Sequence, residues 1–215
     1  QQMGGLVDVD SSLSMVVPGS GKIYYTLDGS DPQIIVESSA PTNLIDQGSA
    51  ATAFIPPNGN LGTSWTDPDF DDSSWLQGTT GIGYHTSISN VYHSLIGLDV
   101  LAMRTNNSSA YVRIPFTISN QEELDRIDSL VFEMKYDDGF VATINGTEIA
   151  SANSPSSPVW NSIATVGHSN AEAVEFEEFD VPSGVSALRV GANVLTLHAL
   201  NRAVSNSDLL MSPRL

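Results

Sequence analysis

The stretch at 135–150, KYDDGFVATINGTEIA, constrains the fold of this chain more than any other part of the sequence. The triplet DDG at 137–139 interrupts one extended run, and a second run, FVATI, ends at Asn145-Gly146. An Asn-Gly pair between two such runs is the strongest short-range signal for a β-hairpin. The adjacent carboxylates of Asp137 and Asp138 need solvent, backbone donors or a cation around them, because an unpaired charge is costly to bury. The stretch therefore predicts strands joined by an acidic turn that lies outside the core.

Extended runs punctuated by Gly, Asn and Pro continue along the chain to its end. In the clearest run, AYVRIPFTI at 110–118, Tyr111 and Arg113 fall on one side and Val112 and Ile114 on the other. Helical character is confined to one turn, QEELDRI. We expect further strands at 53–55, 130–136, 173–181 and 193–201, and a last strand or tail at 209–215. Regular strands with almost no helix predict an all-β fold, an antiparallel β-sandwich of the jelly-roll type.

Charge and cysteine content narrow the function classes. Lys and Arg number 8 against 25 Asp and Glu, so the net charge is −17. Such a surface repels phosphate backbones and anionic lipids, and suits divalent cations and neutral ligands. The absence of cysteine excludes thiolate catalysis, disulfides and cysteine-bound zinc. No apolar run reaches the roughly 18 residues that cross a bilayer, so we expect neither membrane insertion nor nucleic-acid binding.

Residues 1–40 read as a separate, short β appendage, and residues 41–215 as the main domain. The string GKIYYTLDGSDP at 21–32 resembles the signature of the fibronectin type III-like module at the carboxyl end of chitobiases. About 40 residues are too few to bury an independent core, so we expect a partial module. The chain begins at Gln1 with no visible leader, and we expect it to be a piece of a longer protein.

The acidic turn is a candidate calcium site. Calcium takes six to eight oxygen ligands, so Asp137 and Asp138 would need partners, which the segment 201–208 could supply through Asn201, Asn206 or Asp208. The alternative is that both aspartates serve only turn formation.

A second group of acids at 67–72 lacks the EF-hand spacing. For these acids we expect side chains that close Asx turns, and the less favoured alternative is a structural calcium site.

Candidate ligand-binding residues are aromatic or basic. Trp160 is the best candidate for stacking on a sugar ring, because it lies in a polar loop where core packing does not obviously need it. Tyr84, His85 and Tyr92 belong to a long loop expected at 84–109. Arg113 either pairs with a carboxylate on the sheet or clamps a ligand. Trp65, Trp75 and His198 are expected in the interior.

Several strings occur together in order: FDDSSW with TGIGY after it, YVRIPF, YDDGFVATINGTEIA, GANVLTLHALN and SDLL. As a set they resemble the galactose-binding-like jelly-roll domain, including carbohydrate-binding modules, of multimodular exported bacterial proteins. The resemblance implies an extracellular location, other modules in the same polypeptide, and a polysaccharide or cell-surface glycan as partner. The DDG–NG segment alone resembles calcium-dependent adhesin domains in which two consecutive aspartates hold the calcium that binds sugar hydroxyls.

These observations lead us to expect a non-catalytic carbohydrate-binding module, with calcium as its possible cofactor. The alternative is a structural or protein-interaction module in which calcium serves stability only. An enzyme acting on glycans is the third reading. It would need two carboxylates across a cleft, for which the sequence carries no specific signal.

Overall fold

A computed structural model of the chain describes residues 16, 25–26, 29–30, 42–87 and 92–215. The chain divides into two units, Gln1–Thr42 and Asn43–Leu215. The strands expected within 1–40 fall outside the described residues. The second unit is described below.

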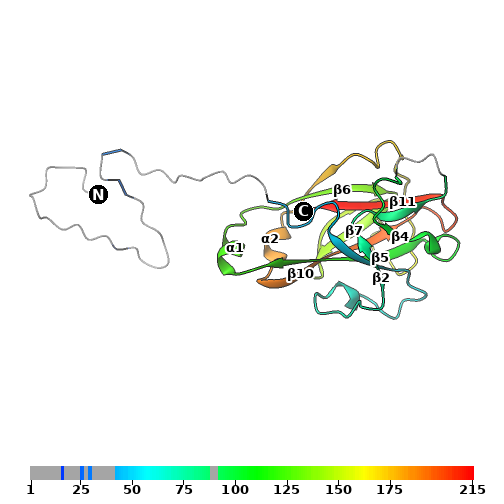
Figure 1. Ribbon diagram of the computed structural model, residues 1–215, viewed down its shortest axis with the longest axis horizontal. Helices are drawn as coiled ribbons and strands as arrows, with labels where there is room; N and C mark the ends of the chain where they lie inside the picture. The colour runs from blue at the N-terminus through cyan, green and yellow to red at the C-terminus, as the bar shows by residue number, and fades with distance from the viewer. Residues whose placement is uncertain (1–15, 17–24, 27–28, 31–41, 88–91) are drawn as a thin grey trace, which may run out of the picture. The chain divides into compact units, whose positions relative to one another are not determined.

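Two β-sheets pack face to face in this unit (Figure 1). Sheet A is antiparallel throughout, in the order β2 (Leu76–Thr79), β1 (Ala50–Phe54), β5 (Ser109–Ile118), β10 (Gly191–Leu200), β7 (Gly139–Ile144), β8 (Thr147–Ala152). Sheet B has the order β4 (Leu98–Asp99), β3 (Ile82–His85), β11 (Asp208–Arg214), β6 (Val131–Asp137), β9 (Glu177–Asp180), and only its β3–β4 pair is parallel. Short helices fill the connections: η1 (Ser64–Thr66), η2 (Leu101–Met103), α1 (Gln121–Asp125) and α2 (Gly184–Ala187).

Alternation along the strands explains why the two sheets close on each other. In β5, Val112 and Ile114 belong to the main core, whereas Tyr111 and Arg113 lie on the outer face of sheet A. Successive side chains of a strand point to opposite faces, so one face can be apolar while the other carries polar and aromatic groups. The predicted all-β sandwich is confirmed, as is the helical turn, which forms α1.

The acidic stretch is divided between the two sheets. Asn145 and Gly146 have φ angles of 50° and 83°, and they join β7 to β8 as the predicted hairpin. The triplet at 137–139 is not a turn within one sheet, however. Asp137 ends β6 in sheet B, Gly139 begins β7 in sheet A, and the peptide bond between Asp137 and Asp138 is cis. The two aspartates therefore lie where the chain passes from one layer to the other.

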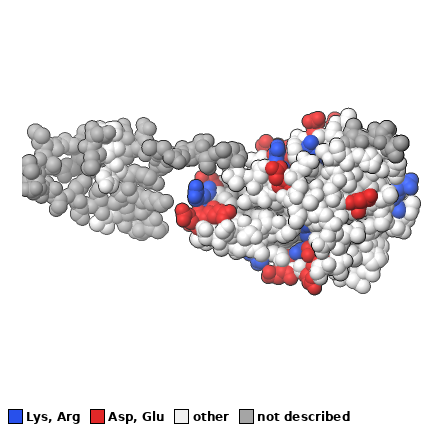
Figure 2. Space-filling model, in the orientation of Figure 1, with Lys and Arg blue, Asp and Glu red and all other residues white. Residues whose placement is uncertain are grey.

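Charged side chains are sparse on the face of this unit that Figure 2 presents. Figure 2 shows acidic and basic residues in small separate groups on a mostly uncharged face. None of the helices within the described stretches has the length and apolarity that crossing a lipid bilayer requires.

Candidate functional site

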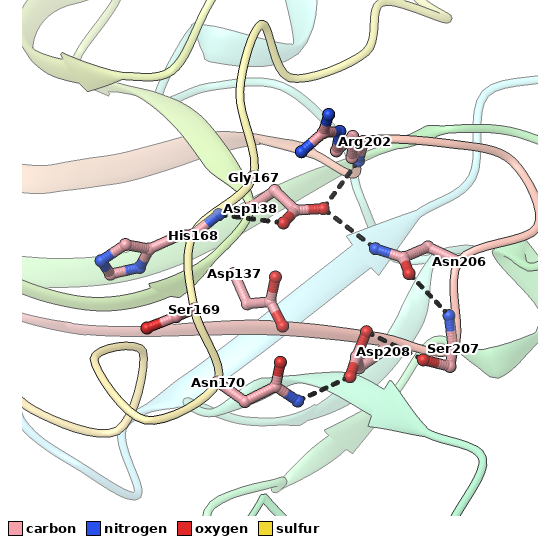
Figure 3. A pocket seen from close by; sticks show the side chains of 10 residues that line it. All are labelled: Asp137, Asp138, Gly167, His168, Ser169, Asn170, Arg202, Asn206, Ser207 and Asp208. Carbon is pink, nitrogen blue, oxygen red and sulfur yellow. Dashed lines mark hydrogen bonds between the residues drawn. The ribbon is translucent and has the colours of Figure 1, made fainter.

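A polar cavity of about 440 Å³ lies at the end of the sandwich where β6 and β10 finish and β11 begins. Its wall combines the acidic crossover with two loops, 167–170 and 202–207, and Figure 3 shows the side chains converging on it. The lining residues are Asp137, Asp138, Gly167, His168, Ser169, Asn170, Arg202, Asn206, Ser207 and Asp208. Three carboxylates from two distant parts of the sequence, 137–138 and 208, thus line one space.

Asp138 joins the two loops. Its Oδ1 accepts a hydrogen bond from the backbone N–H of His168 at 3.1 Å. Its Oδ2 accepts from the backbone N–H of Arg202 at 2.8 Å and from the side-chain amide of Asn206 at 3.0 Å. Hydrogen bonds to a carboxylate are stronger than those between neutral groups, so this buried side chain fixes the position of both loops.

Asp208 forms the opposite wall of the cavity. Its Oδ2 accepts a hydrogen bond from the side-chain amide of Asn170 at 2.8 Å and lies 3.1 Å from Nε2 of His85. The hydroxyl of Ser207 donates to its Oδ1 at 3.2 Å. This carboxylate is therefore already oriented by side chains from three segments.

Asp137 lies between these two carboxylates and is 2% exposed. The hydroxyl of Tyr92 donates to its Oδ2 at 2.8 Å. Burial raises the pKa of Asp137 well above its ordinary value, and the neighbouring carboxylates of Asp138 and Asp208 add to the effect. Desolvation and like charges both disfavour the ionised form, so this group binds a proton or a cation readily.

Basic side chains do not neutralise the cavity. Within the part of the chain that the structure describes, the ion pairs of arginine lie elsewhere, on Asp72, Asp69 and Glu133. Arg202 contributes its backbone N–H to Asp138, but its guanidinium forms none of those pairs. The cavity is thus an acidic, oxygen-rich space in which, among the described residues, His85 contacts Asp208 but no lysine or arginine pairs with a carboxylate.

Asn201 and Tyr84 lie beneath the cavity. Asn201 is fully buried and donates to the hydroxyl of Tyr84 at 3.0 Å and to the carbonyl of Asp208 at 2.7 Å. Its Oδ1 already accepts from the amide of Asn206 at 2.7 Å. Asn201 is not among the residues that line the cavity, and its side chain supports Asn206 and Asp208, which are. Metal binding by Asn201 stays a prediction.

Tyr84 and Tyr92 offer no ring face to a sugar. Tyr84 is 2% exposed and Tyr92 is fully buried. Tyr84 belongs to β3, together with His85, whose ring meets that of Tyr92 edge-on at 5.7 Å between centroids. The three residues predicted to bind ligand from a surface loop do not line the cavity but lie behind it, where Tyr92 contacts Asp137 and His85 contacts Asp208.

Arg113 is a structural residue. Its Nε donates to Oδ2 of Asp72 at 2.7 Å, and its remaining bonds go to the backbone carbonyls of Trp65, Asp67 and Phe70. It is 4% exposed, and these contacts use its donors. A ligand-clamping role is therefore wrong, and its carboxylate partner lies in a loop over the sheet, not on the sheet.

The acids at 67–72 form turns, as expected. Oδ1 of Asp67 accepts from the backbone N–H of Asp69 at 2.8 Å, and Oδ1 of Asp71 accepts from that of Ser73 at 3.0 Å. Both are Asx turns, which hold the loop whose carbonyl groups surround Arg113.

Trp160 is half-buried at the edge of an aromatic cluster on the outer face of sheet A. The buried members of this cluster are Trp65, Trp75 and Tyr111, so the two tryptophans expected in the interior are there. A Cβ at Gly59 would lie 2.9 Å from Cδ1 of Trp160, so the indole packs directly on the loop backbone. Sugar stacking by Trp160 stays a prediction.

His198 is buried beneath the same cluster, at ring centroid distances of 5.0 Å from Tyr111 and 6.3 Å from Trp65. Its Nε2 has no hydrogen-bond partner among the described residues. The expected interior position of His198 is confirmed.

The lining residues of the loop at 167–170, which include His168 and Asn170, were not predicted from the sequence. His168 stacks on Tyr136 at 4.2 Å between ring centroids, and its Nδ1 lies 2.7 Å from the carbonyl of Tyr136. The only local signal is the polar run GHSN at 167–170, and no spacing connects it with Asp138, thirty residues earlier.

No protein-family model matches the chain, and no curated protein matches it either. Solved structures with some similarity include a β-glucuronidase of Bacteroides uniformis, with 12% identity and a TM-score of 0.44, covering 80% of this chain and 18% of that one. An exo-chitosanase of Amycolatopsis orientalis has 11% identity and a TM-score of 0.41, with 80% and 21% covered. A β-glycosidase of Bacteroides vulgatus has 12% identity and a TM-score of 0.40, with 77% and 20% covered. The chain spans about a fifth of these proteins, and the likeness concerns the arrangement of strands alone.

Proposed function

We propose that this chain is a non-catalytic carbohydrate-binding module of an exported multimodular protein, and that it binds glycan hydroxyls in the acidic cavity with the help of calcium. The observation that carries the proposal is the cavity itself. Its volume of about 440 Å³ falls in the range of small-molecule sites, and side-chain oxygens, amides and hydroxyls line it. Polyhydroxylated ligands need such alternating donors and acceptors.

The chemistry of the lining supports calcium as the cation. Asp137, Asp138 and Asp208 offer carboxylate oxygens, and Asn170 and Ser207 offer neutral ones. Hard cations such as calcium prefer oxygen ligands of this kind. Among the described residues no three His, Asp or Glu side chains already stand close enough together to enclose a metal. We therefore expect two carboxylates, neutral oxygens, water and sugar hydroxyls to complete the coordination.

Binding without catalysis is part of this proposal. The cavity carboxylates are engaged by Tyr92, Asn206 and Asn170. In that arrangement they hold loops and a cation, and we assign none of them to proton transfer.

A purely structural role for calcium is the second candidate. It is favoured by the contacts of Asp138, which already tie together the loops at 168 and 202–206. A cation on the same carboxylates would stabilise the loops whether or not a glycan binds.

The test is calorimetry and a glycan array on the full chain, with calcium and with chelator, for the wild type and Asp137→Asn. The substitution removes one charge and keeps an oxygen that can accept from Tyr92. Asp128→Asn, at an exposed position outside the cavity lining, is the matched control. We expect calcium-dependent glycan binding that Asp137→Asn abolishes and Asp128→Asn retains.

Other outcomes separate the alternatives. A melting temperature that rises with calcium while every glycan stays silent would support the structural role and contradict glycan binding. Release of reducing ends from a polysaccharide panel would contradict the non-catalytic assignment.

A further inference from the structure

Arg202 is the one Lys or Arg among the residues that line the cavity. Its backbone N–H is used by Asp138, but its side chain is exposed and extends along the rim. Figure 3 shows the guanidinium on one side of the cavity and Asp208 on the other, with Asp137 between them. Within the described residues, no carboxylate lies within 4.0 Å of this guanidinium. A full positive charge therefore stands beside an acidic cavity without entering it.

Gly167 explains how the guanidinium stays at the rim. A Cβ at this position would lie 3.0 Å from Nη1 and 3.4 Å from Cδ of Arg202, and 3.3 Å from Oδ1 of Asp138. The end of the arginine side chain thus rests on the backbone of the cavity wall, in space that any other residue would fill. The absence of a side chain at 167 lets Arg202 and Asp138 approach the same point from two directions.

Four other basic side chains of this unit contact the protein itself. Arg113 is enclosed by Asp72 and backbone carbonyls, and Arg214 forms two hydrogen bonds with Glu133. Arg189 contacts Asp69 and the carbonyl of Ala192, and Lys135 lies over the ring of Phe176. By contrast, the guanidinium N–H donors of Arg202 are available for a ligand at the rim of the acidic cavity. A guanidinium fork matches the planar geometry of a carboxylate, with which it forms two parallel hydrogen bonds.

We propose that Arg202 is a specificity-determining residue, and that the sugar bound in the cavity carries a carboxylate, as uronic acids do. This inference rests on the proposed function. The cation would hold ring oxygens of the sugar near Asp137, while the carboxylate pairs with Arg202 at the rim. Three aspartates against one divalent cation leave a single negative charge, and Arg202 compensates it, so the loaded site accepts an anionic sugar despite the net charge of −17.

The test compares an acidic trisaccharide with its own methyl ester, by calorimetry in calcium, for galacturonate, glucuronate and guluronate. Short oligomers avoid gelation of the polysaccharide by calcium. The ester keeps the sugar and removes only the charge. We expect at least one free acid to bind the wild type about tenfold or more tightly than its ester, because a bidentate charged pair is lost. Arg202→Gln should lose this preference and keep the calcium-induced rise in melting temperature.

The matched control is Arg126→Gln, which removes an exposed arginine at the end of α1, outside the cavity lining. This substitution removes one positive charge, as Arg202→Gln does, and the variant should retain the preference for the free acid over the ester. Equal binding of acid and ester by the wild type, or an unchanged preference in Arg202→Gln, would overturn the inference. Calcium-dependent binding of neutral glycans alone would overturn it and leave the proposed function standing, whereas silence on all glycans would overturn both.

Discussion

The acidic cavity and the enclosure of Arg113 both bury charge at a surface of the sandwich, but they differ in whether that charge is paired with an opposite one. The guanidinium of Arg113 is surrounded by acceptors: the carboxylate of Asp72 lies 2.7 Å away, and three backbone carbonyls accept further hydrogen bonds. In the cavity, Asp137, Asp138 and Asp208 accept hydrogen bonds from Tyr92, Asn206 and Asn170, and His85 lies 3.1 Å from Asp208. Within the described residues, no lysine or arginine forms an ion pair with them.

The difference separates a structural site from the binding site that we propose. A buried charge that is fully paired stabilises one arrangement and has no capacity left for a ligand. A buried carboxylate that is oriented but unpaired keeps an affinity for a proton or a cation, and the raised pKa of Asp137 reflects this.

Arg113→Met should destabilise the protein most, by about 3–5 kcal/mol, because it leaves Asp72 and the loop carbonyls without their partner. Urea unfolding at pH 7 measures the effect. Arg189→Met is the control: its contact with Asp69 is exposed and 3.3 Å long, and its loss should cost less than about 1 kcal/mol. Equal effects of the two substitutions would mean that the enclosure of Arg113 contributes nothing special.

His198→Phe should make the protein more resistant to acid. Burial lowers the pKa of His198 to about 4, so below the ordinary value near 6.5 the unfolded chain takes up a proton that the folded chain refuses. Stability present above pH 6.5 is then lost as the pH falls toward 4. Between pH 7.5 and 4.5 the wild type should lose about 2–3 kcal/mol more than the variant. Unfolding curves at both pH values measure this, and His93→Phe, at an exposed position, should behave as the wild type.

Asp137→Asn should stabilise the calcium-free protein at pH 8 by about 1–3 kcal/mol, because the ionised carboxylate is penalised by burial and by its neighbours. A folded-state pKa above the unfolded one means that stability is full below about pH 4 and is lost as the pH rises. The gain should therefore vanish at pH 4. Asp72→Asn, in the paired region, should instead destabilise. Thermal melts in chelator at both pH values measure the two changes in stability. If both variants changed stability in the same direction at pH 8, the contrast between the cavity and the paired region would be refuted.

Calcium affinity should rise with pH, by up to about tenfold per unit below the folded-state pKa of Asp137, because the ion displaces its proton. Calorimetry in two buffers of different ionisation enthalpy measures the proton released. An affinity independent of pH between 5 and 8 would show that Asp137 is not a ligand.

Local patterns in the sequence determined much of the scaffold. The alternation in AYVRIPFTI assigned the two faces of β5, Asn145-Gly146 fixed the hairpin of β7 and β8, and the acids at 67–72 indicated Asx turns. Each of these features depends on residues within a few positions of one another, so the sequence displays it directly.

Tertiary structure alone decided the composition of the site. The chain passes from sheet B to sheet A at Asp137-Asp138, and this crossover meets His168 and Asn170 from a loop with no local signature. The tertiary structure also buries Tyr84 and Tyr92 under the cavity and pairs Arg113 with Asp72, 41 positions away in the sequence. Such contacts depend on which strands pair and how the two sheets pack. Burial of the whole core determines both, and no short stretch of sequence encodes them.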